Sequence, residues 1–313
     1  MIRRGLAVLA LAVAPLAATG AGTVATAGGV APRAPAARLS PAAVAAGEVS
    51  GARGGPCVGA PASRHYSHVV WIVMENEGFG QVADSAAAPF LRRLGSECGL
   101  ATDYLAVAHP SLPNYLAMTS GSTDGVTDDA DPIVHRLSER SIFSQLSGGW
   151  RALEDAMPGP CDRVTSGLYA ARHDPAVYFT DLRATCARDV VPLRYPLDLS
   201  ARFTFITPDV CNDMHSCPIA TGDEWLAKTV GSIVSSSQYR AGGTALFVVW
   251  DESEAAGANR VAAYVVAPSV PRGSRVGAPF THYSLLATAE DLLGLPRLGA
   301  ARTARSMVVP FHL

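Results

Sequence analysis

Four short runs of apolar residues stand out along the chain. They are HVVWIVM (residues 68–74), FTFIT (203–207), TALFVVW (244–250) and VAAYVVA (261–267), and β-branched and aromatic side chains are frequent in them. Runs of this length without alternating polar residues are typical of strands buried on both faces, as in a parallel sheet. We therefore predict a buried strand at each of these four positions.

Segments with a helical period accompany these runs. TGDEWLAKTVGSIVSS (221–236) opens with Thr221 and Glu224 at the spacing of a capping box and then places its apolar side chains on one face. HYSLLATAEDLLG (282–294) has the same amphipathic spacing and ends in glycine, a common helix terminator. Strands that alternate with helices predict an α/β fold, here a single domain with a central, mostly parallel sheet flanked by helices.

The first residues have the three parts of a secretory signal peptide. Arg3 and Arg4 precede an apolar stretch at 6–16, and Ala-Thr-Ala at 25–27 offers a cleavage site between small residues. We predict a signal peptide over residues 1–27 and a secreted, extracellular protein. The paired arginines leave both the general and the twin-arginine export routes open.

Composition changes again after the signal peptide. Residues 28–62 are mostly Ala, Pro and Gly, which bury too little surface to offset the entropy of ordering, so we expect a flexible leader before one domain at 63–313. No later stretch approaches the ~20 apolar residues of a spanning helix, so we expect no stable membrane insertion. Loss of the two signal-peptide arginines moves the net charge from -2 to -4, and an acidic protein is a poor nucleic-acid binder.

An even number of cysteines in an exported chain indicates disulfides. The six are Cys57, Cys98, Cys161, Cys186, Cys211 and Cys217. Pairing of nearest neighbours (57–98, 161–186, 211–217) is our expectation, although six cysteines allow fifteen arrangements. The alternative, a zinc site built from Cys211, His215 and Cys217, is less favoured because no matching second half of the site exists in the sequence.

Acidic residues follow three of the predicted strands. Glu75-Asn76 comes after the first strand, Asp251-Glu252 follows 244–250, and Asp213 lies shortly after 203–207. Ligands of open α/β sheets bind beyond the carboxyl ends of the strands, so these side chains are expected to converge on a cation. Oxygen donors favour one hard divalent ion, calcium, magnesium or manganese.

The segment HPSLPNYLAMTSG (109–121) places Ser111 at the start of a predicted helix that stops at Gly121. Taken alone, Ser111 is best explained as a helix cap. A helix N-terminus also favours anions, and a nearby cation would make the serine hydroxyl a better nucleophile toward phosphorus. Together with the acids at the strand ends, this favours Ser111 as a nucleophile and metal neighbour.

Other polar residues are candidates for the same site. His215 is a candidate general acid because it follows Asp213 in a short loop bounded by cysteines. Asn114 could donate its amide hydrogens to a phosphate oxygen. Candidates for substrate binding are Asn114, His109, His173 and His282. The aspartate-rich segment GSTDGVTDDADP (121–132) lacks the EF-hand spacing and is interpreted as a solvated connection.

With these residues assembled, the chain resembles the bacterial phosphoesterase family of secreted acid phosphatases and phospholipases C, which is similar in fold to the alkaline phosphatase superfamily. The resemblance is carried by HVVWIVMENEGF, AHPSLPNYLAMTSG, ITPDVCNDMHSC with GDEWL, and VVWDESE, and RHDP and HYSLLATAEDLLGLP add to it. In size the chain is most similar to the compact actinobacterial acid phosphatases. Its RHDP differs from the His-Asn-Pro often found in the family.

The resemblance implies a function and assigns roles. It implies a metal held by Glu75, Asn76, Asp251 and Glu252, with Asp213 added less firmly and Ser111 as nucleophile beside it. His215 would be the general acid, with Asn114, His109 and His173 near the phosphate and His282 lining the site. The function expected first is a metal-dependent phosphomonoesterase with a phosphoserine intermediate, acting on a small-molecule or lipid-headgroup phosphate ester. The alternatives are a phospholipase C or other phosphodiesterase, and a non-catalytic protein that binds anions.

The sequence has no GxSxG, GxxxxGK[ST] or GxGxxG motif, so neither a serine esterase nor a nucleotide cofactor is indicated.

Overall fold

All four predicted strands are present in the computed structural model, which describes residues 55–63, 66–254 and 258–313. The strands are β1 (His68–Met74), β2 (Gly99–Leu105), β3 (Trp150–Glu154), β4 (Val190–Pro192), β5 (Phe203–Thr207), β6 (Thr244–Trp250), β7 (Arg260–Val266), β8 (Arg275–Val276) and β9 (Phe280–Thr281). The helices are α1 (Phe79–Val82), α2 (Pro89–Glu97), α3 (Ser111–Ser120), α4 (Ile142–Gln145), α5 (Cys186–Asp189), α6 (Ile219–Val234), α7 (Ser237–Arg240), α8 (His282–Leu293) and α9 (Val308–Phe311).

The described strands form one mostly parallel sheet. Their order is β4-β3-β5-β1-β6-β7-β2-β8, and β9 also pairs with β2. Only β7 runs antiparallel to its neighbours β6 and β2 among these pairs. The central strands β1, β5 and β6 are almost entirely buried, as their uninterrupted apolar runs predict. The expected single-domain α/β fold is confirmed for this part of the chain.

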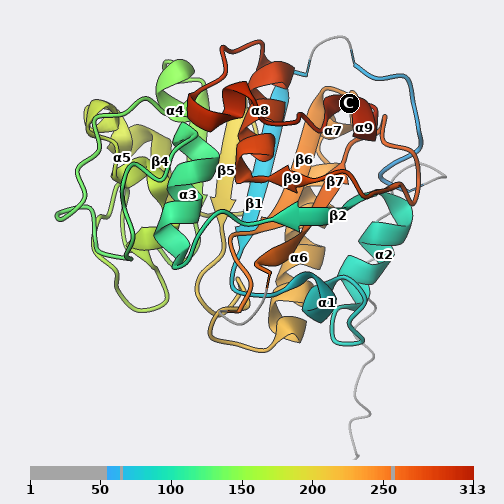
Figure 1. Ribbon diagram of the computed structural model, residues 1–313, viewed down its shortest axis with the longest axis horizontal. Helices are drawn as coiled ribbons and strands as arrows, with labels where there is room; N and C mark the ends of the chain where they lie inside the picture. The colour runs from blue at the N-terminus through green and yellow to red at the C-terminus, as the bar shows by residue number, and fades with distance from the viewer. Residues whose placement is uncertain (1–54, 64–65, 255–257) are drawn as a thin grey trace, which may run out of the picture. The chain divides into compact units, whose positions relative to one another are not determined.

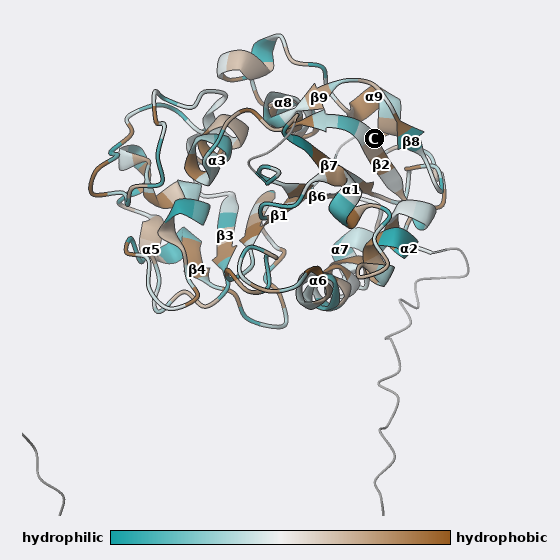
Figure 2. Cartoon of the chain, turned by 60° about the horizontal axis from the view of Figure 1, so that its bottom comes forward, coloured by the Kyte–Doolittle hydropathy of each residue, from teal (hydrophilic) through white to brown (hydrophobic). Residues whose placement is uncertain are grey.

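Helices cover both faces of the sheet. Helices α3 and α8 pack together on one face, and α6 lies with α2 and α7 on the other (Figures 1 and 2). Apolar side chains gather on the strands between these layers, including three fully buried tryptophans, Trp71, Trp150 and Trp250. The sheet is therefore rigidly held from both sides, and its strand ends are fixed relative to one another.

Two helix ends agree with the sequence and one helix start does not. Helix α3 ends before Gly121, whose φ of 80° is left-handed and whose Cβ, if present, would lie 2.6 Å from the Leu298 carbonyl oxygen. Helix α8 ends in the same way before Gly294. Helix α6 begins at Ile219, two residues earlier than expected, and its N-cap is Pro218, so the predicted capping box of Thr221 and Glu224 does not form.

The expected disulfide pairing is confirmed. Cys57 bonds to Cys98, Cys161 to Cys186, and Cys211 to Cys217. The last bond leaves no thiolate for the alternative zinc site. It also closes the short loop that carries Asp213 and His215, and so fixes that loop beside the sheet edge.

The predicted signal peptide (1–27) and the leader as far as residue 54 lie outside the described residues. The last part of the predicted leader packs on the domain: Cys57 is fully buried, and the N–H groups of Val58 and Ala60 donate to the Pro268 carbonyl oxygen. Its disulfide explains why this segment is packed although its composition predicts a flexible chain. None of the helices in the described ranges is long and apolar enough to cross a membrane.

Candidate active site

The carboxyl ends of β1 and β6 bring Glu75 and Asp251 side by side. The two strands pair in parallel, with Met74 opposite Trp250, so the residue after each strand leaves the sheet at the same edge. The Asp251 N–H donates to the Met74 carbonyl oxygen at 2.9 Å, and Asp251 Oδ1 accepts from the Asn76 N–H at 3.2 Å. Both carboxyl groups are fully buried.

Ser111 is the first residue of α3 and points at these carboxylates. Its hydroxyl donates to Glu75 Oε2 at 3.0 Å and lies 3.4 Å from Glu252 Oε1. It does not cap the helix, because the N-cap residue is Pro110 and no side chain caps from that position. Instead, Asp129 Oδ1 accepts from the Leu112 N–H at 2.9 Å. The hydroxyl therefore contacts the acidic cluster, by which we mean the carboxylates of Glu75, Asp251 and Glu252.

Asn76 adds a further polar group to the cluster. Its φ of 52° is left-handed, a conformation that asparagine adopts more readily than most residues. The outer end of its amide lies 3.3 Å from both Glu75 Oε2 and Glu252 Oε1. If the amide nitrogen faces these two carboxylates, it donates a hydrogen bond to each of them. If the amide oxygen faces them, Asn76 adds a third oxygen to the group, and such a group is stabilised by a bound cation.

A divalent cation fits this set of donors. Asp251 Oδ2 is buried and, within the described chain, has no hydrogen-bond partner. Burial raises the pKa of Glu75 well above its usual range, and the negative charges of Asp251 and Asp213 raise it further. Burial also raises the pKa of Asp251, with the charge of Glu252 acting in the same direction. A bound cation would offset this repulsion, and an all-oxygen set suits a hard ion.

His173 joins the cluster from the short 3-10 helix Ala171–His173. Its Nε2 lies 3.3 Å from Glu75 Oε1 and its Nδ1 lies 3.4 Å from Asp213 Oδ2, and all three residues are buried. Their potential ligand atoms lie within 4.8 Å of one another, so this group could itself hold a metal ion. The sequence analysis expected His173 near the phosphate, and the structure places it beside the carboxylates Glu75 and Asp213.

Tyr115 is a site residue that the sequence analysis missed. It lies one helical turn after Ser111, on the same face of α3. Its hydroxyl donates to Glu75 Oε1, and its ring stacks on that of His173 with centroids 5.3 Å apart. The spacing of Ser111 and Tyr115 within SLPNY, which puts both on one face of the helix, was the sequence signal that could have identified Tyr115 as a site residue. Tyr115 therefore orients His173 and Glu75, the carboxylate that accepts from the Ser111 hydroxyl.

Replacing Tyr115 with phenylalanine is expected to lower metal affinity or turnover by about 10- to 100-fold, the usual cost of losing a group that orients a metal ligand. Tyr239→Phe is the matched control, because the Tyr239 hydroxyl also donates a buried hydrogen bond, to the Pro56 carbonyl oxygen. Metal titration and steady-state kinetics of both variants make the comparison. Equal effects of the two changes would show that Tyr115 acts only through stability.

His109 and His215 lie at the more open side of the cluster. His109 Nδ1 pairs with Glu252 Oε2, and its side chain is 39% exposed. The backbone N–H of His215 donates to Asp213 Oδ1 at 2.7 Å, and the His215 ring centroid lies 6.2 Å from that of His173. Burial lowers the pKa of His215, and the positive charge of Arg172 lowers it further. Both histidines are therefore placed where a substrate could reach them.

Asn114 makes its contacts within the protein. It is fully buried, its Oδ1 accepts from the N–H groups of Val107 and Ala108, and its Nδ2 donates to the carbonyl oxygens of Ala108 and Pro110. These bonds use the amide groups that the sequence analysis assigned to a phosphate oxygen. Asn114 thus fixes the loop that leads into Ser111.

His282 is also turned inward. Its Nε2 contacts the Asp251 carbonyl oxygen at 2.5 Å, and its Nδ1 lies 3.1 Å from the Tyr104 hydroxyl. The residue is fully buried. It is placed to hold the backbone of Asp251, and both of its ring nitrogens have partners within the protein.

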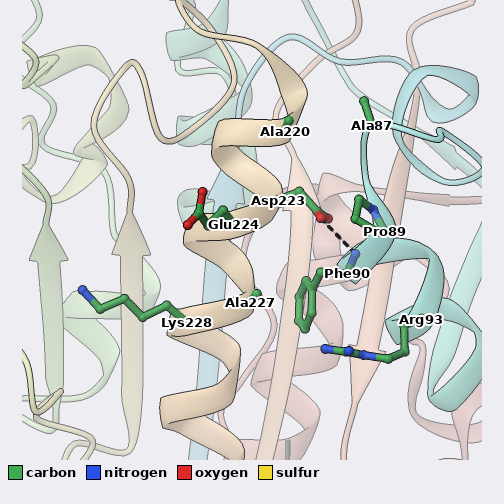
Figure 3. Close-up of a pocket in the computed structure, with 9 residues that line it drawn as sticks. All are labelled: Ala87, Pro89, Phe90, Arg93, Ala220, Asp223, Glu224, Ala227 and Lys228. Carbon is green, nitrogen blue, oxygen red and sulfur yellow. Dashed lines mark hydrogen bonds between the residues drawn. The ribbon is translucent and has the colours of Figure 1, made fainter. Parts of the chain in front are cut away.

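A separate cavity of about 590 Å³ lies between α2 and α6. Figure 3 shows Phe90 and Arg93 of α2 facing Asp223 and Ala227 of α6 across it. The buried Asp223 is used in the fold, since it accepts from the N–H groups of Phe90 and Leu91 at 2.9 Å. None of the candidate site residues lines this cavity.

Solved structures with the same architecture include a protein of the alkaline phosphatase superfamily from Vibrio parahaemolyticus. The two structures superpose with a TM-score of 0.57 at 11% sequence identity, and the match covers 79% of this chain and 71% of that chain. At this identity the likeness shows the fold, and it confirms the expected alkaline phosphatase-like arrangement.

Sequence relatives cover most of the chain. A phosphatidylinositol-3-phosphatase of Mycobacterium tuberculosis is 30% identical over 80% of this chain and 85% of its own length. A phosphate-repressible acid phosphatase of Penicillium chrysogenum is 27% identical over 75% of this chain, which spans 60% of that longer protein. The sequence profile of the Phosphoesterase family matches residues 82–296. The chain therefore belongs to the Phosphoesterase family.

Proposed function

We propose that the protein is a secreted, metal-dependent phosphomonoesterase that works through a phosphoserine intermediate. The observation that carries the proposal is the contact of the Ser111 hydroxyl with the carboxylates of Glu75 and Glu252. The three disulfides support an extracellular site of action.

The donor set supports one divalent ion bound by Glu75, Asn76, Asp251 and Glu252 with Ser111 beside it, and with Asp213 and His173 completing the cluster. Calcium, magnesium or manganese is favoured. When bound, the ion would neutralise the carboxylates, polarise a phosphoryl oxygen and lower the pKa of the serine hydroxyl.

The reaction then needs two steps from the chain's own residues. Ser111 Oγ forms a bond to phosphorus, its proton passes to Glu75, and the ester bond to the alcohol breaks as His215 protonates the leaving oxygen. In the second step water attacks phosphorus, His215 accepts its proton, and Ser111 leaves with the proton held by Glu75. Because the pKa of His215 is lowered, its protonated form is present mainly at acid pH, which suits an acid phosphatase.

The names of the relatives support a substrate class. They are named as a phosphatidylinositol-3-phosphatase and as acid phosphatases, so the proposed substrate is a phosphate monoester, either a small molecule or a phosphoinositide headgroup.

The purified mature protein is expected to hydrolyse p-nitrophenyl phosphate at acid pH and to act much more slowly on bis(p-nitrophenyl) phosphate and p-nitrophenylphosphorylcholine. Initial rates on the three compounds make the test. A preference for either diester would replace the phosphomonoesterase with a phosphodiesterase or phospholipase C, and failure to hydrolyse all three would favour an anion-binding protein.

A further inference from the structure

Arg172 is a cation within reach of an otherwise acidic site. It precedes His173 in the RHDP segment and lies in the same short 3-10 helix. Burial lowers the pKa of His173, and the charge of Arg172 lowers it further, as it does for His215. Burial raises the pKa of Asp213 to about 8, with the charge of Arg172 acting in the opposite direction. The guanidinium therefore lies close enough to the site for its charge to act on His173, Asp213 and His215.

The hydrogen-bonding capacity of Arg172 is largely unused. Its Nε lies 3.8 Å from Asp129 Oδ2, and its side chain is 20% exposed. In the part of the chain that the structure describes, its guanidinium makes this ion pair and no hydrogen bond. A guanidinium has five N–H donors. Those of Arg172 are not among the buried unpartnered atoms of the described chain, so they are open to solvent and an anionic ligand could reach them.

Asp129 locates this guanidinium relative to the nucleophile. One oxygen of Asp129 lies beside Arg172, and the other accepts from the N–H of Leu112, the residue after Ser111. The carboxylate thus links Arg172 to the first turn of α3. The 121–132 segment is a mostly exposed or half-buried connection, as expected, and Asp129 is the residue in it that contacts the first turn of α3.

We propose that Arg172 binds the non-bridging oxygens of the substrate phosphate and makes the site prefer a monoester over a diester, an inference that rests on the function proposed above. A monoester presents up to three non-bridging oxygens and, when fully ionised, two negative charges. The planar fork of an arginine binds two such oxygens at once. A diester carries a single charge and a second alkyl or aryl group on one of these oxygens, so it would gain less from Arg172.

The test compares Arg172→Ala with wild type on p-nitrophenyl phosphate and bis(p-nitrophenyl) phosphate. We expect kcat/KM to fall by about 10²-fold for the monoester, the effect of losing charge-assisted hydrogen bonds, and by less than about 10-fold for the diester. Inhibition by inorganic phosphate should weaken in parallel. Arg136→Ala, an exposed arginine that lines a groove with Asp131 and Arg183, is the matched control and should leave both rates unchanged.

Chemical rescue separates direct binding from a structural role. Guanidinium chloride should restore monoester activity to Arg172→Ala, while sodium chloride at equal ionic strength should not, and Arg172→Lys should recover only part of it because it lacks the fork. Equal losses on both esters, or no rescue by guanidinium, would overturn the role of Arg172 while leaving the phosphomonoesterase intact. A wild-type protein that prefers the diester would overturn the proposed function itself.

Discussion

Replacing Ser111 with alanine is expected to lower turnover of a phosphate monoester by roughly 10⁴- to 10⁶-fold, the size of effect seen when an enzyme loses its nucleophile. Ser111 is buried, and within the described chain its hydroxyl contacts only carboxylates of the acidic cluster, so no other group can take its place. Because Ser111 does not cap α3, the substitution should leave the fold intact.

The matched control is Ser120→Ala at the other end of the same helix. Ser120 is also buried, but its hydroxyl bonds to the Leu116 and Ser122 carbonyl oxygens and to Asp124. Initial rates and thermal unfolding of both variants give the comparison. Near-normal turnover of Ser111→Ala would remove the nucleophile from the proposed mechanism.

Chelation of the purified protein should lower activity by about 10³-fold, corresponding to the several kcal/mol that a bound metal contributes to charge stabilisation. Readdition of calcium, magnesium or manganese should restore it. Asp251→Asn should prevent that recovery, because it removes one of the charged oxygens at the strand end. Recovery with zinc alone would count against an oxygen-donor site.

Thermal unfolding gives a second view of the same ion. Burial and the charge of Glu252 raise the pKa of Asp251, so without a cation its ionised form is destabilising at neutral pH. The metal-free Asp251→Asn variant should therefore be at least as stable as metal-free wild type, and it should lose the rise in Tm that the ion produces. Asp223→Asn, beside the cavity between α2 and α6, should keep that rise.

The buried part of the sheet was predictable from the sequence, and its edges were not. Strands β1, β5 and β6 are continuous apolar runs, so pattern alone identifies them. Strand β2 (GLATDYL) contains Thr102 and Asp103, and its ladder is irregular between Ala101 and Tyr104. Strand β3 (WRALE) is short and carries Arg151 and a buried Glu154, which suggest a loop until their partners are known.

The same contrast holds for the site. Acids directly after parallel strands must meet at one edge, so Glu75 and Asp251 could be brought together from the sequence. Roles that depend on side-chain direction could not be predicted from the sequence. Asn114 and His282 turn into the protein, whereas Tyr115 turns toward Glu75 and Asp129 toward the first turn of α3. These directions are set by tertiary packing.

The most direct test of the account is to trap the phosphorylated enzyme. Wild-type protein mixed with excess monoester and quenched in acid should carry one phosphoryl group, and fragmentation by mass spectrometry should place it on Ser111. With p-nitrophenyl phosphate, whose leaving group needs little protonation by His215 in the first step, a His215→Ala variant should accumulate more of this species, because water attack then lacks its base. A phosphoryl group on another residue of an active enzyme would contradict the proposed role of Ser111.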